Sequence, residues 1–459
     1  MSLPIKIRHL WSRLGFGTNP VNFPLMRDGD LAENIEHLKA SSPVNPIIVA
    51  TSPTRDLNPD RIRAMSQTEK AEFLKSEEDR LDDLRDRWLD HMINQSVNVL
   101  AERMTLFWHG HLTCVCQESA VAASYLNTVR RHALGKFGTL LLAVAQEPAM
   151  IRFLNNQQNR KAHPNENFAR ELLELFTLGE GNYSETDVRS AARAFTGWSS
   201  GFDNRFEFRE RQHDFGEKTF LGQRGNFNGN DIIRIILEQP ACAHFLAGQI
   251  YRHFVNENPD KNHIAELGDV LYESDYDIKL AMVHLMQAEW FYAPENIGNR
   301  IKSPIELLVQ TTQLFGASYE GQGNRTFLQR SLGQLLFNPP NVAGWPGGRH
   351  WINNATLMIR LNLPSYIIKG DRMDHTVLRS LKSEGLSKPL QYLQVEVRLE
   401  SMLSYFRHLE YGDLETSLKG AILLQDTSPS LATQREYRSK DYLERLLLRI
   451  TSLPEFQLG

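Results

Sequence analysis

The sequence has few of the residues and patterns that mark several large classes of protein. It contains three cysteines in 459 residues, and Cys242 lies far from the other two, so no disulfide framework is expected and a reducing compartment is favoured. Its 51 basic residues do not exceed its 55 acidic ones, which gives a formal net charge of −4 and disfavours a nucleic-acid partner. No run of about 18 uncharged apolar residues occurs, so no membrane-spanning segment is expected.

Several enzyme signatures are also missing. The opening MSLPIKIRHLWSRLGFG has no apolar stretch or cleavage site of the signal-peptide kind, which favours a cytoplasmic location. No nucleophile elbow or phosphate-binding loop is present, and the glycine-rich segment 222–229 does not follow a predicted strand. These absences argue against the common serine hydrolases and the nucleotide-dependent enzymes.

Helical periodicity dominates what is present. Residues 61–109 contain neither proline nor glycine, and apolar residues recur at helical spacing from Leu74 to Met92, which predicts one long amphipathic helix. Strand signals are scarce, so the predicted fold is mainly α, a multi-helix body with long functional loops and a helical C-terminal extension. We expect a main domain over 1–370 and a helical C-terminal portion over 371–459 packed on it. Further helices are predicted at about 118–134, 137–146, 165–178, 184–197, 230–238, 240–256, 262–271, 277–289, 303–315, 325–335, 353–362, 372–382, 388–409, 413–424 and 438–451, and long loops at 155–165, 199–230 and 337–351.

The segment FWHGHLTCVC, residues 107–116, allows two interpretations. In a continuous helix His109 and His111 point in different directions, but Gly110 could end the helix in a left-handed cap and turn His111 back beside His109. Cys114 and Cys116 are separated by one residue, whereas zinc sites usually separate paired cysteines by two. The alternative is a helix end with hydrogen-bonded histidines and small buried cysteines, packed by the core residues Phe107, Trp108, Leu112 and Val115.

A second polar segment begins at HPNENFARELLELFTLG. Asn165 can cap a helix on which Glu166, Arg170 and Glu174 lie one turn apart, with Glu171 on the neighbouring face. Such a row is often a surface ion-pair ladder. It could also hold Glu166 or Glu171 in a polar pocket, where burial raises a carboxyl pKa for acid or base catalysis, or where the carboxylate binds a metal.

A further helix is expected to follow directly. Ser184 and Asp187 form a capping-box pattern at its start, and the helix carries Arg193 and leads into Trp198.

Two loops carry the remaining candidate residues. In RQHDFGEKTFLG, His213 and Asp214 form a possible ligand or acid/base pair, and Lys218 adds a cation for an anionic substrate. In PPNVAGWPGGRHW, aromatic and cationic residues surround glycines that allow close backbone approach, which suits a ligand-binding surface or a loop that packs its own tryptophans. The residues of interest in this second loop are Trp345, Arg349, His350 and Trp351.

Together these segments resemble the large bacterial family known as domain of unknown function 1800. The motifs that carry the resemblance, in order, are HLWSRLGFG (9–17), MTLFWHGH (104–111), NENFARELLELFTLG (165–179), the segment 187–198 ending in TGW, HDFGEKTFLG (213–222), KSPIEL (302–307), PPNVAGWPGGRHW (339–351) and the terminal LPEFQLG. The resemblance covers nearly the whole chain and retains both histidines of FWHGH without requiring the cysteines. It implies no assigned activity, although many relatives look exported and are encoded beside a second family, numbered 1501, that resembles sulfatases and phosphatases. Export together with a partner is therefore the alternative to a cytoplasmic location.

Two functional hypotheses follow. The first is a metal-dependent or carboxylate-based hydrolase acting on an envelope or glycan-type substrate, with a divalent zinc, manganese or iron ion as a possible cofactor. Its expected metal ligands are His109, His111 and His213, its catalytic residues Glu166, Arg170, Glu171 and Asp214, and its substrate-binding residues Arg193, Trp198, Lys218, Trp345, Arg349 and Trp351. This hypothesis requires the polar motifs to converge in one cleft.

The second hypothesis is a noncatalytic partner or maturation factor for a sulfatase-like protein of the neighbouring family 1501. In that case the polar ladders should be paired internally, and no open cleft should contain unpaired carboxylates.

Overall fold

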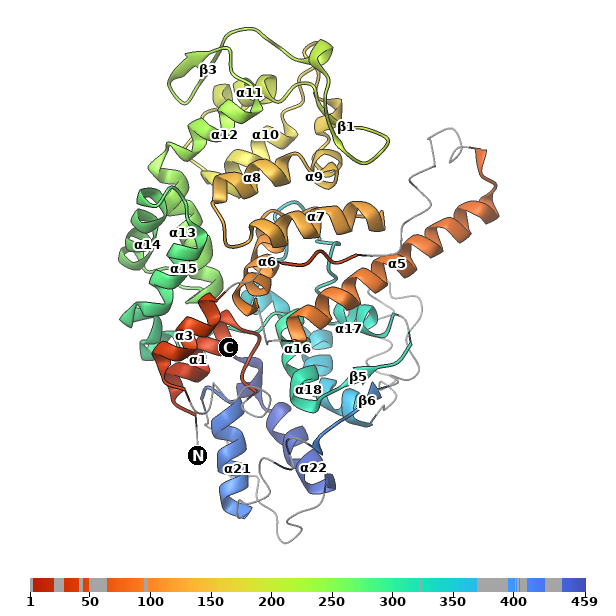
Figure 1. Cartoon of the computed structure of the whole chain (residues 1–459), viewed down its shortest axis with the longest axis vertical. Helices are drawn as coiled ribbons and strands as arrows, with labels where there is room; N and C mark the ends of the chain where they lie inside the picture. Colours follow the sequence, from red (N-terminus) through yellow and green to blue (C-terminus); the bar gives the residue numbers. More distant parts are fainter. Residues whose placement is uncertain are drawn as a thin grey trace.

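The fold was analysed in a computed structural model of the whole chain (Figure 1). The structure describes residues 3–19, 29–40, 44–48, 64–94, 98–321, 323–369, 395–400, 402, 404, 411–425 and 440–459. Within these residues the chain is mainly α-helical, as predicted, and no helix is long and apolar enough to cross a membrane.

The described helices are α1 (Ile5–Leu14), α3 (Leu31–Lys39), α5 (Gln67–Ile93), α6 (Val99–His111), α7 (Ser119–His132), α8 (Phe137–Ala145), α9 (Pro148–Phe153), α10 (Asn167–Glu171), α11 (Glu185–Ala194), α12 (Gly229–Leu237), α13 (Pro240–Phe254), α14 (Lys261–Glu273), α15 (Ile278–Gln287), α16 (Pro304–Phe315), α17 (Asn324–Leu332), α18 (Asn354–Lys369), α21 (Tyr411–Ile422) and α22 (Lys440–Thr451). Three short antiparallel pairs of strands accompany them: β1 (Trp198–Ser200) with β2 (Phe206–Phe208), β3 (Lys218–Phe220) with β4 (Gln223–Gly225), and β5 (Ser318–Tyr319) with β6 (Val395–Glu396).

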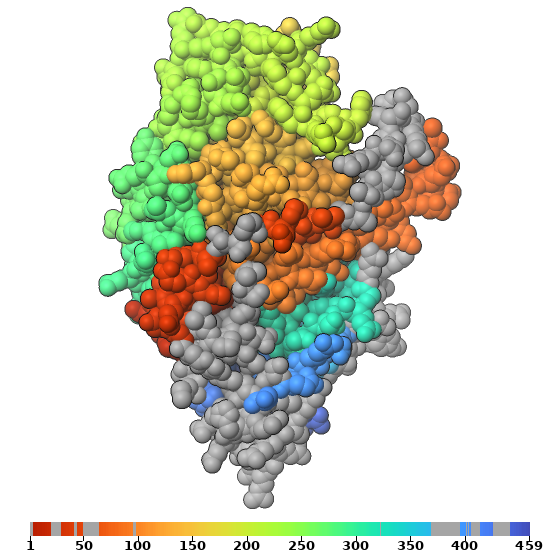
Figure 2. All heavy atoms as spheres, in the orientation of Figure 1, coloured from red at the N-terminus to blue at the C-terminus, as the bar shows by residue number. Residues whose placement is uncertain are grey.

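Helix α6 lies at the centre of the molecule (Figure 1). Every residue from Val99 to His109 is buried, because the helix carries apolar side chains on all sides and packs against α1, α3, α5 and α7. Its two charged residues, Glu102 and Arg103, pair with Arg130 and Glu306. The hairpin β3–β4 packs with α11 toward one end of the elongated molecule, and α21 and α22 form the other end. On the face shown in Figure 2, residues 44–48 lie against α7, where the backbone of Ile47 exchanges two hydrogen bonds with the Asn127 side chain.

The single long helix predicted over 61–109 is wrong, because the chain forms two helices there. Helix α5 ends at Ile93, and α6 starts after Asn98, whose φ of 57° lies in the left-handed region. A residue in that conformation cannot continue a right-handed helix, and asparagine adopts it more readily than most residues. The break lets the apolar α6 enter the core while the charged α5 extends along the surface.

Several charges of α5 are more buried than a solvated helix face would be. Glu77 is 3% exposed, and its carboxylate accepts hydrogen bonds from the backbone N–H and hydroxyl of Ser119 at the start of α7. Asp82 and Arg85 pair at 2.8 Å and are also buried. These carboxylates therefore join α5 to its neighbours, as Glu77 does by satisfying free N–H groups at a helix N-terminus.

Two other predicted segments differ in detail. The long loop predicted over 199–230 contains both strand pairs β1–β2 and β3–β4. The helix predicted over 165–178 becomes α10 followed by a π-helix, Leu172–Thr177. The helix predicted over 372–382 lies outside the described residues, and the described part of 388–409 includes strand β6.

The C-terminal residues return to the middle of the molecule beside α1 (Figure 1). The Gly459 backbone N–H donates to the carbonyl oxygen of Arg300 at 2.7 Å, and the Lys302 N–H donates to that of Gln457 at 2.9 Å. The Lys302 ammonium also donates to the carbonyl oxygen of Phe456 at 2.6 Å. These contacts fix the segment that leads into α16.

Candidate functional site

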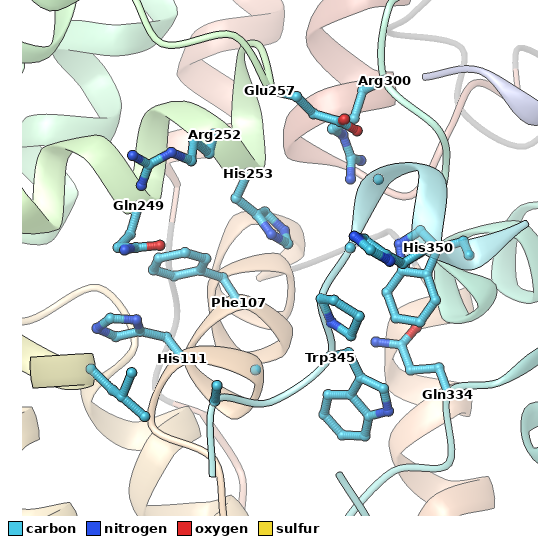
Figure 3. Close-up of a pocket in the computed structure, with 18 of the residues that line it drawn as sticks. Phe107, His111, Gln249, Arg252, His253, Glu257, Arg300, Gln334, Trp345 and His350 are labelled. Carbon is cyan, nitrogen blue, oxygen red and sulfur yellow. The ribbon is translucent and has the colours of Figure 1, made fainter. Parts of the chain in front are cut away.

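A cavity of about 740 Å³ opens between the C-terminal ends of α6 and α13, the π-helix and the glycine-rich loop that precedes α18 (Figure 3). Aromatic side chains, amides and charged groups of both signs line the cavity. The lining includes Phe107, Phe245, Trp345 and Trp351, the amides Gln249 and Gln334, the histidines His111, His253 and His350, the cations Arg252, Arg300 and Arg349, and the carboxylates Glu174, Glu180 and Glu257.

His111 is placed at the cavity by the last turn of α6. Of the two interpretations of FWHGHLTCVC, the left-handed cap at Gly110 does not form, because α6 runs through His111 and Gly110 has no positive φ. The two histidines of FWHGH therefore keep their different directions, and only His111 lines the cavity.

A hydrogen bond fixes the tautomer of His111. Its Nε2 lies 3.0 Å from the carbonyl oxygen of Phe176, so Nε2 carries the proton and Nδ1 keeps a free lone pair. The Phe176 carbonyl belongs to the π-helix. At the end of this helix the Leu178 N–H donates to the carbonyl oxygen of Leu173, five residues earlier in the chain. Burial lowers the pKa of His111 to about 4, partly opposed by this hydrogen bond. The ring is therefore neutral at physiological pH.

The glycine-rich loop forms the opposite wall by docking on the end of α6. Gly344 has a φ of 77°, and a Cβ atom there would overlap the carbonyl oxygen of Gly110, so only glycine allows this approach. Trp345 then stacks on His109, with ring centroids 5.4 Å apart and planes at 18°. At Gly348, with a φ of 53°, a Cβ atom would lie 2.6 Å from the Glu257 carboxylate.

His109 lies behind the cavity wall. It is 1% exposed, and its Nε2 accepts a hydrogen bond of 3.2 Å from the Phe337 backbone N–H. Burial lowers the pKa of His109 to about 3, which makes it a neutral core residue. Cys114 and Cys116 are likewise buried free thiols.

Buried cations form one end of the cavity. Arg300 lines it, and the Arg300 and Arg103 guanidinium groups both donate to Glu306. The Glu306 carboxylate also accepts from the Ser303 N–H at 2.5 Å, in a capping box that starts α16. Arg13 lies nearby and donates to the carbonyl oxygen of Asn296 at 2.8 Å. Burial lowers the pKa of Arg300 to about 10, and lowers the pKa of Arg13 and of Arg103 as well.

The predicted catalytic residues on α10 and at its start do not line this cavity. Arg170 pairs with Glu166 at 3.1 Å and with Glu185 at 2.7 Å, as in the ion-pair ladder considered from the sequence. Burial and the nearby Glu174 carboxylate raise the pKa of Glu171. Glu174, in the π-helix, and Glu180, in the turn that follows it, reach the cavity.

The candidate residues of the hairpin region also lie away from the cavity. Arg193 pairs with Asp214 at 2.7 Å, and the buried Lys218 donates to the carbonyl oxygen of Asp214 at 2.6 Å. His213 is buried, and its Nδ1 lies 2.8 Å from the carbonyl oxygen of Thr196. These bonds hold the turn before β3 against the end of α11.

Trp198, at the start of β1, is a buried aromatic contact. Its ring lies edge-on to Phe195 and Phe206, with ring centroids 5.0 and 5.2 Å apart. Like the other candidates of the hairpin region, Trp198 does not line the cavity.

Of the residues given a role in the hydrolase hypothesis, the structure brings together four, namely His111, Trp345, Arg349 and Trp351, and His350 of the same loop lies with them. Across the described ranges of the chain, no group of three or more histidine, cysteine, aspartate or glutamate side chains is arranged to hold a metal ion. The expected ligands His109, His111 and His213 have separate surroundings, so these donors do not fit a shared metal site.

The sequence prediction did not include the α13 side of the cavity. Gln249, His253 and Glu257 recur every four residues, so the polar face of this helical segment was visible in QIYRHFVNE. Arg252 lies beside them, and Arg300 precedes the KSPIEL motif by two residues.

Comparison with known proteins gives the family. No curated protein and no solved structure matches this chain. Residues 9–458 match the family described as "Protein of unknown function (DUF1800)". Because the match spans nearly the whole chain, as the motifs led us to expect, the chain belongs to this family.

Proposed function

We propose that the chain is a hydrolase that acts on a saccharide-type substrate in the cavity between α6, α13 and the glycine-rich loop. The observation that carries this proposal is the neutral His111, whose Nε2–H is fixed by the Phe176 carbonyl and whose Nδ1 remains free to accept a proton.

The walls of the cavity support the substrate class. Its volume of about 740 Å³ is within the range of small-molecule sites. Trp345, Trp351 and Phe107 offer apolar ring surfaces, and Gln249 and Gln334 offer amides that suit hydroxyl groups. A sugar ring has apolar faces and polar hydroxyl groups, so it is complementary to a cavity that offers both kinds of surface.

In the proposed mechanism the Nδ1 of His111 acts as a general base and removes a proton from the water that attacks an ester carbonyl of the substrate. The protonated ring then returns this proton to the departing alcohol oxygen as the ester C–O bond breaks. The Arg252 guanidinium group lines the same cavity and would stabilise negative charge that develops in the transition state. Three carboxylates line this space, namely the half-buried Glu174 and the exposed Glu180 and Glu257.

Replacement of His111 tests this proposal. His111→Gln should lower kcat/KM by at least about 100-fold, since a positioned general base contributes about 10² to 10⁴. The wild-type rate should be constant above about pH 5 and fall as the pH drops through about 4, where His111 becomes protonated. A panel of chromogenic esters and glycosides provides the assay.

His163→Gln is the matched control, because His163 is exposed and does not line the cavity. The proposal fails if the wild type hydrolyses none of these substrates, or if His111→Gln is folded and as active as the wild type.

One observation favours the alternative of a noncatalytic partner for a sulfatase-like protein. The Glu166–Arg170–Glu185 row and the Arg193–Asp214 pair are internally salt-bridged, as that hypothesis expects. The carboxylates in the cavity favour the enzyme instead. A pull-down from native lysate separates the two, because recovery of no partner counts against the noncatalytic role.

A further inference from the structure

Three buried guanidinium groups, Arg13, Arg103 and Arg300, form what we call the arginine cluster. Arg13 and Arg103 are 0% exposed and Arg300 is 6% exposed. Burying a cation is costly unless opposite charge and hydrogen-bond partners compensate, so the partners of the cluster are informative.

The hydrogen bonds of the arginine cluster are incomplete. Arg300 Nε, Arg103 Nη1, and both Nε and Nη1 of Arg13 are buried without a hydrogen-bond partner among the described residues. Nε2 of His253, in the last turn of α13, is also buried without a hydrogen-bond partner among the described residues. Buried donors are nearly always paired in folded proteins, so several unpaired donors in one place point to a ligand.

The charges near the arginine cluster are also unbalanced. Glu306 is shared between Arg103 and Arg300, and Glu257 acts on Arg13 and Arg300 from an exposed position. Lys302 adds a further buried cation whose ammonium donates to a backbone carbonyl rather than to a carboxylate.

Two of the side chains that carry unpaired nitrogens line the cavity. Arg300 and His253 both line it, and Figure 3 shows them on the same side, with Glu257 and Arg252 nearby. The arginine cluster also acts on His253, because burial and the neighbouring charges of Arg103, Arg300 and Arg13 lower its pKa well below the usual value. The positive potential is therefore directed to this end of the cavity.

We propose that this end binds a phosphate or sulfate ester group of the substrate, held by the guanidinium group of Arg300 and the imidazole of His253. A tetrahedral oxyanion presents oxygens in several directions and can bind donors from α13 and from the segment before α16 together. A carboxylate has two coplanar oxygens and suits a single arginine better. The inference rests on the proposed function, because it places the anionic group of the same substrate in the same cavity.

Anion binding by the full chain tests the inference without any turnover. Inorganic phosphate, sulfate and acetate are titrated by calorimetry at constant ionic strength, with chloride as the background ion. Phosphate and sulfate should bind saturably and raise the thermal midpoint. Acetate should bind at least about tenfold more weakly. The phosphate and sulfate arms show which ester the site prefers.

Arg300→Gln should weaken binding of the preferred anion by at least about tenfold, since it removes a charged donor. Arg205→Gln is the control with the same chemical change, because Arg205 is exposed and outside the cavity. If Arg300→Gln does not fold, the His253→Gln variant is measured in its place. Its affinity for the preferred anion should be at least about tenfold lower than that of the wild type.

The inference is overturned if neither phosphate nor sulfate binds saturably, if acetate binds as tightly as they do, or if the folded Arg300→Gln or His253→Gln variant binds as the wild type does. Failure of the hydrolase proposal is seen separately, because it depends on turnover and on His111.

Discussion

At the scale of the residue, His109 shows how burial sets the charge of a side chain. Its pKa in the folded protein is about 3, compared with 6.5 in an unperturbed histidine. Below about pH 6.5 the His109 imidazole binds a proton in the unfolded chain but not in the folded chain. The stability contributed by neutral His109 is therefore complete above that pH and is lost as the pH falls toward 3.

In the His109→Gln variant the unfolding free energy should fall less steeply as the pH is lowered. Between pH 6.5 and 4, the unfolding free energy of the variant should depend on pH by about 1.4 kcal/mol per unit less than that of the wild type. Chemical denaturation at several pH values measures both slopes. The exposed His163→Gln should keep the wild-type slope, and equal slopes for His109→Gln and the wild type would contradict the burial argument.

The residues of the site were only partly predictable from the sequence. Motif residues such as His111 and Trp345 do line the cavity, because they lie at the end of α6 and in the glycine-rich loop that form its walls. Glu166 and Glu174 lie two turns apart on one predicted face, yet Glu174 reaches the cavity and Glu166 does not. Arg103 pairs with Glu306, which lies 203 residues further along the chain, and no local pattern reveals such a partner.

At the scale of the element, the docking of the glycine-rich loop depends on Gly344. Gly344→Ala should separate the loop from the end of α6, because the new Cβ would overlap the Gly110 carbonyl and the φ of 77° is strained for alanine. We expect a loss of stability greater than the about 1–2 kcal/mol of the backbone strain alone. The loss is measured by chemical denaturation, with weaker anion binding as a second readout.

Gly333→Ala, at the C-terminal end of α17, is the control for backbone strain. Gly333 also lies in the left-handed region, with a φ of 93°, but no atom lies within 4 Å of an added Cβ. It should lose only the stability that corresponds to the backbone strain, so equal losses for Gly344→Ala and Gly333→Ala would argue against the close contact with α6.

Most helices could be predicted from periodicity, because their burial follows their apolar stripe. Helix α12 was expected over 230–238 and is observed from Gly229 to Leu237, with its four isoleucines buried. The break at Asn98 and the π-helix could not be predicted in this way, because each depends on the conformation of a few residues that hardly changes the apolar pattern.

At the scale of the whole molecule, Phe456 anchors the C-terminal segment beside the arginine cluster. It is 0% exposed, and the ammonium of Lys302 lies 4.4 Å from its ring centroid. Phe456→Ala should lower the unfolding free energy by about 3–5 kcal/mol, the usual cost of an aromatic cavity in a core. Phosphate binding should weaken as well, because the segment carrying Arg300 loses its support.

Chemical denaturation and phosphate titration measure both effects. Phe202→Ala serves as the control, since Phe202 is 78% exposed and its truncation should change stability by no more than about 0.5 kcal/mol. A Phe456→Ala protein as stable as the control would show that the C-terminal segment is not part of the cooperative core.

The arginine cluster joins parts of the chain that are distant in sequence. Arg13 binds Asn296, Arg103 binds Glu306, and Lys302 binds Phe456. Contacts that close such long loops form late in folding, after the local helices. After dilution from denaturant, helical circular dichroism should therefore recover before anion binding does, so a preparation can regain its helices while still lacking its site.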